Sequence, residues 1–445
     1  MRRRSTFILF VAFLAALAPA ASAQEITGTI TGTVTDNTGA VLPGATVSGR
    51  NLGMGFVKSV VANENGNYTL PFLPVGDYEI TFSLSGFTPY SAKVRLHVND
   101  RISVNASLQV GAQSETVEVL AAATLVQPTA AVQNLMGPTQ VQELPLNNRN
   151  FAQLATLVPG VSSSLPDEVG VGLTANVSIS INGARRNAVN WLVDGASNVD
   201  VGSNITLLNT PTLESIEEFK IITSSYAAEW PRSGGGIINV VTKSGSNTFR
   251  ASAYEFYRND SLNANNFFRK QSTDPALRDN PAPLDYNNFG FTVGGPIKKD
   301  KLFFFFSQEW RKISRPSQVS ANTVDPAWLT NPANPNYVAP ALRDPNAVRL
   351  LEAWPAPNTG TGFLDQRPND QDTRQEVIRL DWSVNNSWRV MGRYTHDLSE
   401  TTEAGGLFFN TPLPDLATTQ TRVPGQVGVL QVVTTITPRL LNEFS

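Results

Sequence analysis

The chain has 445 residues, of which 16% are charged, and its formal net charge is −3. This balance gives no basic surface of the kind that binds nucleic acid. Cysteine is absent and the only histidines are His97 and His396, so the sequence offers neither a disulfide framework nor a thiolate metal site. The frequent glycines (32) and prolines (29) are typical of proteins built from strands and turns.

Residues 1–23 have the pattern of a signal peptide. Three arginines, Arg2 to Arg4, precede an apolar core at Phe7 to Ala18, and Ala21-Ser22-Ala23 is a small-residue cleavage site. The core is shorter than the ~20 residues that span a bilayer, so we predict export with cleavage before Gln24 rather than an uncleaved membrane anchor. No later apolar run is long enough for a transmembrane helix, so a membrane location would require a β-barrel.

Residues 24–110 are predicted to form a β-sandwich, because short Thr- and Val-rich runs recur between turn sequences. We expect strands at 26–35, 45–50, 57–62, 68–70, 76–84, 92–98 and 103–109. The run GTVTDNTGAVLPGATV, from Gly32 to Val47, resembles the carboxypeptidase regulatory-like domain, a transthyretin-like sandwich. No peptidase is implied, since zinc carboxypeptidases need His and Glu ligands and His97 is alone in this segment. We interpret His97 as an ordinary strand residue.

The predicted linker at 111–131 contains a short extended run, Glu115-Thr116-Val117-Glu118-Val119-Leu120-Ala121. It resembles a TonB box, the segment of an outer-membrane transporter that a periplasmic partner captures as an added strand. Backbone hydrogen bonds supply most of the affinity in such pairing, so the motif makes little demand on sequence. The alternatives are the last strand of the sandwich and a plain linker.

Residues 132–246 are predicted to form a small α+β domain of short elements. We expect helical segments at 141–144, 150–157 and 213–217, and strands at 177–181, 190–193, 218–222 and 236–242. Two glycine-rich motifs stand out, and together they resemble the plug domain of TonB-dependent outer-membrane transporters. Their residues are Asn182, Gly183, Arg185, Arg186, Asp194 and Gly195 in the first, and Gly234, Gly235 and Gly236 in the second.

The plug motifs allow more than one interpretation. Arg185 and Arg186 either face solvent or pair with charges inside a barrel, and we favour the pairing. Asp194-Gly195 is interpreted as a turn. The glycines at 234–236 are either a flexible linker or a place of close backbone approach, and the β pattern that resumes at Ile237 favours close approach.

Residues 247–445 are predicted to be part of an outer-membrane β-barrel. We expect strands at 248–258, 286–297, 302–313, 374–382, 388–397 and 421–437, and the start of a seventh at 440–445. The connections between them alternate between long and short, as extracellular loops and periplasmic turns do in such barrels. Phe303 to Phe306 and the tryptophans Trp310, Trp382 and Trp388 are predicted to form an interfacial aromatic girdle, with a globular core as the alternative.

The order of these segments resembles the Oar-like group of TonB-dependent transporters. The resemblance implies energised uptake of a large or scarce substrate, in which the TonB–ExbB–ExbD complex of the inner membrane pulls on residues 115–121. It also implies a barrel of 22 strands in contact with outer-membrane lipid. Since the predicted strands are too few to enclose the plug, we expect the chain to be a fragment or a truncated product. The substrate class stays open between a glycan, a peptide and a metal chelate.

Two other functions compete with transport. One is a surface adhesin or carbohydrate-binding outer-membrane protein without transport, and the loop alternation disfavours an adhesin built as a secreted β-sandwich, which would have no reason to sort its loops by length. The other is an enzyme such as a periplasmic peptidase, which the sequence disfavours because it has no G-x-S-x-G or H-E-x-x-H motif. We therefore expect no catalytic residue, metal ion, cofactor or nucleic-acid partner.

Overall fold

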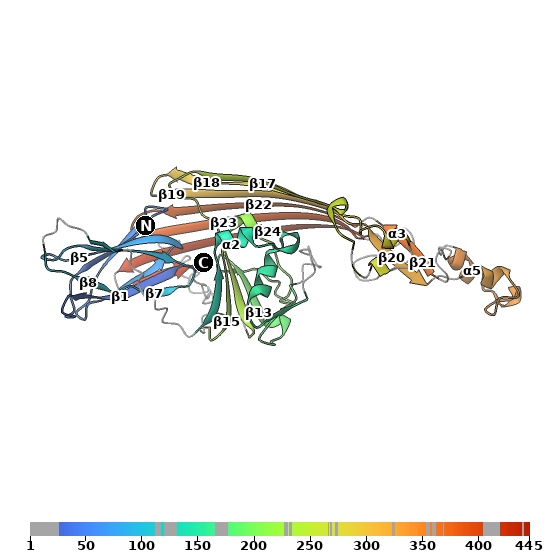
Figure 1. The fold of residues 1–445 in the computed structure, drawn as a ribbon, viewed down its shortest axis with the longest axis horizontal. Helices are drawn as coiled ribbons and strands as arrows, with labels where there is room; N and C mark the ends of the chain where they lie inside the picture. Colours follow the sequence, from blue (N-terminus) through green and yellow to red (C-terminus); the bar gives the residue numbers. More distant parts are fainter. Residues whose placement is uncertain are drawn as a thin grey trace, which may run out of the picture.

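The computed structural model is mainly β. It describes residues 26–445 except 112–116, 120–130, 165–176, 227–229, 231–233, 266, 268, 272–274, 323–324, 353–356, 358–361, 368, 404–418 and 438–439. One long sheet runs along the molecule, with a sandwich domain at one end, a central domain under one face and a hairpin projecting at the other end (Figure 1). The predicted signal peptide lies outside the described residues.

The sandwich domain consists of two sheets over a shared core. The first sheet contains β1 (Gly28–Asp36), β4 (Asn67–Leu73), β7 (Arg101–Ser103) and β8 (Ala106–Leu108). The second has the order β3 (Val57–Val61), β2 (Thr46–Asn51), β5 (Gly76–Ser83), β6 (Tyr90–Leu96) and β9 (Val117–Val119). Alternate residues of these strands, such as Ile30, Leu70 and Ile80, are fully buried between the sheets. The predicted strands are present, and the last of them is divided into β7 and β8.

The central domain has a five-stranded sheet with helical turns on one face. The sheet order is β10 (Val132–Met136), β15 (Ile216–Ser224), β16 (Gly236–Thr242), β13 (Val189–Val193) and β14 (Ala196–Ser197), and a separate pair is β11 (Val161–Ser163) with β12 (Ile179–Ile181). The helices are α2 (Pro138–Glu143), η1 (Asn147–Arg149), η2 (Phe151–Leu157), η4 (Arg186–Ala188) and η5 (Leu213–Ser215). Phe151 packs edge-on against Trp191 and Phe219, which joins the helices to the sheet.

The long sheet, called the wall below, is a meander of seven strands. They are β17 (Arg250–Asn259), β18 (Asp285–Lys298), β19 (Leu302–Ser314), β22 (Asp370–Ser383), β23 (Trp388–Glu403), β24 (Thr419–Thr437) and β25 (Leu440–Phe444). On β22, Ile378 and Leu380 are each 43% exposed on the outer face, while Arg379 and Asp381 are buried on the inner face. Apolar residues outside and charged residues inside are the pattern of an outer-membrane barrel.

The connections of the wall differ at its two ends. Short turns join β18 to β19 and β22 to β23 at the end that carries the sandwich. Long connections lie at the opposite end (Figure 1) and include the helices η6 (Asp260–Leu262), η7 (Arg269–Gln271), α3 (Pro275–Arg278), α4 (Ala327–Thr330), η8 (Pro340–Leu342) and α5 (Pro345–Glu352). They also include a hairpin of β20 (Ser317–Asn322) and β21 (Gly362–Arg367), which was not predicted. Across the described ranges, every helix is too short or too polar to cross a bilayer.

The phenylalanine run divides between the two faces of the wall. Phe303 and Phe305 are buried on the inner face, so they do not belong to the predicted outward girdle. Trp382 and Trp388 are about half exposed near the short turns, as the girdle prediction requires. Trp310 stacks on Phe289 of β18 with 5.4 Å between ring centroids.

Candidate functional site

The central domain meets the wall at a buried carboxylate, Asp194. After β13, Asp194 and Gly195 turn the chain with left-handed φ angles of 47° and 76°. Glycine adopts such angles freely, and aspartate tolerates them better than most residues. This turn places the Asp194 side chain against the wall, where the residue is only 2% exposed.

Two arginines of the wall hold this carboxylate. Arg379 Nη1 on β22 lies 3.3 Å from Asp194 Oδ1, and Arg393 Nε on β23 lies 2.9 Å from Asp194 Oδ2. Thr242, at the end of β16, donates to the same carboxylate through its backbone N–H at 2.9 Å and its hydroxyl at 2.7 Å. These four residues are called the Asp194 lock below.

The charges of the Asp194 lock and of the neighbouring Asp381 balance only while the central domain is in place. Arg379 and Arg393 are register partners on β22 and β23, so two cations lie side by side. Arg379 also donates to both oxygens of Asp381, at 2.9 and 3.0 Å. Withdrawing Asp194 would remove the carboxylate that both guanidinium groups share, and an uncompensated buried charge costs about 3–5 kcal/mol.

Further contacts join the loops of the central domain to the same strands. The Thr210 N–H donates to Asp397 Oδ2 at 3.1 Å, and the Thr210 carbonyl accepts from Gln375. The hydroxyl oxygens of Thr212 and Ser307 lie 3.4 Å apart. These polar contacts attach the central domain to β19, β22 and β23, and a small apolar cluster that includes Val241 and Met391 adds to them.

Glu214 forms a third contact region near β17. Its carboxylate pairs with Arg149, and the Arg149 guanidinium lies 3.8 Å from the ring centroid of Phe256 on β17. Burial raises the pKa of Glu214, and the charge of Arg149 partly opposes that shift. The cation of Arg149 thus links a buried carboxylate of the central domain to an aromatic side chain of the wall.

The sandwich domain is attached to the central domain by buried charges, which we call the sandwich latch (His97, Val98, Asp100, Glu218 and Lys220). His97 Nδ1 lies 2.6 Å from Glu218 Oε1, and the Val98 N–H donates to Glu218 Oε2 at 3.0 Å. Lys220 donates to the Val98 carbonyl at 2.5 Å and to Asp100 Oδ1 at 3.1 Å. Glu218 and Lys220 are 0% and 1% exposed, so the loop after β6 supplies partners to two buried ions. The interpretation of His97 as an ordinary strand residue is therefore wrong.

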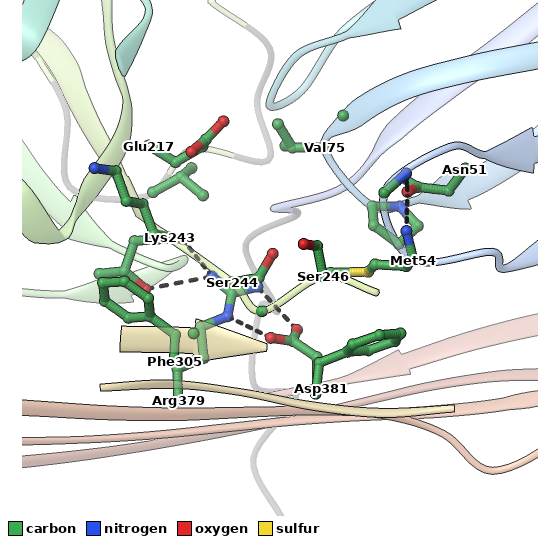
Figure 2. Close-up of a pocket in the computed structure, with 18 of the residues that line it drawn as sticks. Asn51, Met54, Val75, Glu217, Lys243, Ser244, Ser246, Phe305, Arg379 and Asp381 are labelled. Atoms are coloured by element: carbon green, nitrogen blue, oxygen red, sulfur yellow. Dashed lines mark hydrogen bonds and ion pairs between the residues drawn. The ribbon is translucent and has the colours of Figure 1, made fainter. Parts of the chain in front are cut away.

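A cavity of about 490 Å³ lies where the sandwich domain, the central domain and the wall meet. Figure 2 shows Glu217 and Lys243 on one side of it and Arg379 with Asp381 on the other. Glu217 pairs with Arg95 of the sandwich at 3.1 Å, and burial nevertheless raises the pKa of Glu217. Burial also lowers the pKa of Lys243. The cavity is thus a charged junction at the end of the wall that carries the short turns.

Comparison with known proteins gives three matching family models and one informative curated relative. The carboxypeptidase regulatory-like domain matches residues 29–109, the TonB-dependent receptor plug domain matches 126–237, and an outer membrane beta barrel domain matches 241–445. The TonB-dependent transporter Oar of Myxococcus xanthus is 29% identical over 394 residues, which is 84% of this chain. The chain combines a TonB-dependent receptor plug domain with an outer membrane beta barrel domain. It spans 34% of the length of that relative.

Solved structures of two receptors are also similar to the chain. The siderophore receptor PirA from Acinetobacter baumannii is 17% identical with a TM-score of 0.42, covering 68% of this chain and 37% of that one. A mutant of the ferric enterobactin receptor PfeA from Pseudomonas aeruginosa is 14% identical with a TM-score of 0.42, covering 68% and 38%. The family consists of receptors and transporters rather than enzymes, in agreement with the expectation from the sequence.

In this chain, the first plug motif does not use its arginines to reach the wall, so the favoured pairing of Arg185 and Arg186 inside a barrel is wrong. Arg185 and Arg186 are exposed, and Arg186 donates to Ser178 at 2.9 Å within the plug. Asn182 and Gly183 form a turn with φ angles of 51° and 77°. The ion pairs to the wall come instead from Asp194, which the sequence indicated only as a turn.

The second plug motif is a place of close backbone approach. The N–H groups of Gly234 and Gly235 both donate to the Ala188 carbonyl, at 3.0 and 2.9 Å. A Cβ atom on Gly235 would lie 2.7 Å from the Ala184 Cβ. Gly236 has a φ of 143°, so side chains are disfavoured there on backbone grounds as well. These glycines therefore allow β16 to start against the η4 turn.

The candidate TonB box is only partly described. Val117–Val119 forms β9, which pairs in parallel with β6 of the sandwich. Glu115, Thr116, Leu120 and Ala121 lie outside the described residues. The central part of the candidate box is thus a strand of the sandwich sheet, an arrangement that the sequence left as one of three alternatives.

Proposed function

We propose that the chain is the gated part of a TonB-dependent outer-membrane receptor that takes up a large or scarce substrate. The Asp194 lock carries this proposal. It attaches the plug to the wall through buried ion pairs, and a path along the inner face of the wall requires those pairs to break or exchange. A lock made of charges can be released by a directed force and can re-form in the same geometry, whereas an apolar interface would have no such discrete release point.

The proposed organisation follows the family. Residues 1–23 would be a cleaved signal peptide, 24–110 a transthyretin-like sandwich, 111–131 a linker, 132–246 the plug, and 247–445 the first strands of a barrel of 22 strands. The seven wall strands cover one side of the plug. Because barrel diameter grows with strand number, a barrel that surrounds this plug needs more strands than seven.

The proposed location is the outer membrane, with the apolar outer face of the wall against lipid. The short turns and the sandwich domain would then face the periplasm, and the long connections with β20 and β21 would face outward. The substrate, a glycan, a peptide or a metal chelate, would bind the long connections and the outer side of the plug. No cofactor is required for this step.

Energy would come from the TonB–ExbB–ExbD complex of the inner membrane. Its periplasmic strand would pair with the candidate box at Glu115 to Ala121, of which β9 is the described part. A pull there would be transmitted to β10 and the plug sheet. Movement of the plug would separate Asp194 from Arg379 and Arg393.

The alternative is an adhesin or carbohydrate-binding protein of the outer membrane that does not transport. Deletion of residues 115–121 in the full-length protein separates the two, and fractionation tests the outer-membrane location. The transport proposal expects recovery in outer membranes and loss of uptake on deletion, with surface binding of the substrate retained. Recovery in the soluble secreted fraction, or uptake that survives the deletion, would contradict it.

A further inference from the structure

The strand β9 lies at the end of a sheet. Its three residues pair with β6 in the order Tyr90 with Val117, Ser91 with Glu118 and Ala92 with Val119. Among the described strands, β9 has no neighbour on its other side. One edge of β9 is thus occupied by the sandwich, and no strand in the described part of the chain pairs with its opposite edge.

An open strand edge is a template for pairing. Successive residues of a strand direct their backbone N–H and C=O groups alternately to its two sides, so pairing with β6 uses only part of the hydrogen-bonding capacity of β9. An extended segment of another protein can add to the remaining edge through main-chain hydrogen bonds. β9 therefore does not have to leave the sandwich before a partner strand binds it.

The sandwich also offers a second connection from β9 to the plug. β6, the partner of β9, ends at Leu96, and the sandwich latch begins at His97. The latch holds Glu218 and Lys220 of β15, a central strand of the plug sheet. A load applied to β9 while it remains paired would pass through β6 and the latch to β15, in addition to the covalent linker.

The two modes of capture load different parts of the molecule. If TonB separated the box from β6, the force would act on the chain after the sandwich. The sandwich, which precedes the box in sequence, would then transmit no force to the plug. If β9 stays in the sheet, the sandwich is pulled together with the box. Two buried ions held by the sandwich loop are a connection suited to the second mode, because separating them leaves both charges without partners.

We propose that a periplasmic energy-coupling protein adds a β-strand to the open edge of β9 while β9 stays paired with β6. The sandwich sheet and the partner strand then form one continuous sheet, and the pull reaches the plug through the sandwich latch as well as the linker. This inference rests on the proposed function, since it takes Glu115 to Ala121 as the coupling segment.

A disulfide between β6 and β9 tests the inference directly. Ser91 and Glu118 are register partners and the chain has no native cysteine, so Ser91→Cys with Glu118→Cys gives a single defined crosslink. In the full-length receptor, the oxidised form should bind the periplasmic domain of TonB within about two-fold of the reduced form and should retain uptake. If oxidation abolishes binding and reduction restores it, the box must leave the sandwich and the inference is overturned.

Deletion of Val117–Val119 distinguishes this failure from a failure of the proposed function. If the deletion abolishes TonB binding, the role of this segment in energy coupling is supported. If the disulfide crosslink between positions 91 and 118 also blocks binding, only the inference that β9 stays paired with β6 is overturned. Binding and uptake that survive the deletion would overturn the proposed function together with the inference. The two single-cysteine variants are the controls for the substitutions themselves.

The load path has its own test. Asp100→Asn combined with His97→Gln weakens the latch on the sandwich side and leaves β9 intact. We expect TonB binding to be unchanged and uptake to fall by at least ten-fold at equal abundance in the outer membrane. Glu64→Gln, in an exposed turn of the same domain, is the matched control. Uptake that equals the control would show that the latch carries no load, which overturns the second half of the inference.

Discussion

Asp194 of the plug and Arg393 of the wall form an ion pair of 2.9 Å in which the side chains are 0% and 2% exposed. The pair connects a tight turn of the central domain with the middle of a wall strand. The negative charge of Asp194, a single turn residue, therefore helps to hold the plug against the wall.

Replacing Asp194 by Asn should loosen the plug. The substitution keeps the size of the side chain but removes the carboxylate that pairs with both Arg379 and Arg393, so we expect a loss of about 3–5 kcal/mol in the stability of the plug–wall contact. A loosened plug should be more sensitive to protease and should admit large antibiotics into cells, and both effects can be measured. Asp279→Asn, in an exposed ion pair with Arg278, is the control and should change neither. If the Asp194→Asn receptor were as resistant to protease and as impermeable to antibiotics as this control, the Asp194 lock would not be what holds the plug.

Gly236→Ala should destabilise the plug by roughly 1–3 kcal/mol. The added Cβ would lie 2.7 Å from Ile181 Cδ1 and 3.0 Å from the Ile222 carbonyl, and the φ of 143° disfavours any side chain. Thermal unfolding of the full-length receptor in detergent reports the change. Gly137→Ala serves as the control, because a Cβ there meets nothing within 4 Å and φ is −79°. Equal melting temperatures for the two variants would contradict the close approach of β16.

A lysine in place of Ile378 should impair insertion of the wall. Ile378 lies on the outer face, and a lysine facing the middle of a bilayer costs about 2–4 kcal/mol. Folding of the full-length receptor into lipid vesicles measures the effect. Asp372→Lys, on the same face of β22 nearer the long connections, should cost much less. If both lysines were tolerated equally, the outer face of β22 would not be in contact with lipid.

The junction of sandwich and plug should become more stable when Glu217 is made neutral. Burial raises the pKa of this carboxyl group above its ordinary value, so its protonated form is favoured in the folded state. Stability from this group is therefore present below the ordinary carboxyl pKa and is lost as pH rises through the raised value. Glu217→Gln should remove that pH dependence from the melting temperature. At neutral pH it should also raise the melting temperature, but only modestly, because the side chain is 29% exposed and screened by solvent. A lower melting temperature at neutral pH would mean that the pair with Arg95 outweighs burial.

Local sequence patterns predicted most of the elements but few of the contacts between domains. The wall strands alternate visibly, so their predicted bounds lie within four residues of those observed, except that β23 extends six residues further, to Glu403. The short and polar β20–β21 hairpin has no such alternation. The lock joins Asp194 to Arg379 and Arg393, and the latch joins His97 to Glu218. Nothing in the spacing of these residues signals a contact, because each pair is brought together only by the packing of one domain on another. Charged residues within an otherwise apolar strand, such as Glu218 and Lys220 in β15, are the sequence signs of partners in another domain.

The proposed gating is tested most directly by fixing the plug to the wall. The hydroxyl oxygens of Thr212 and Ser307 lie 3.4 Å apart, so Thr212→Cys with Ser307→Cys places a removable disulfide across the contact in a chain without native cysteine. Uptake by the full-length receptor is measured in the oxidised and reduced states, with each single variant as a control. We predict that oxidation stops uptake while surface binding of the substrate continues, and that reduction restores uptake. Undiminished uptake by the fully oxidised receptor would show that the plug need not move away from the wall, which contradicts the account.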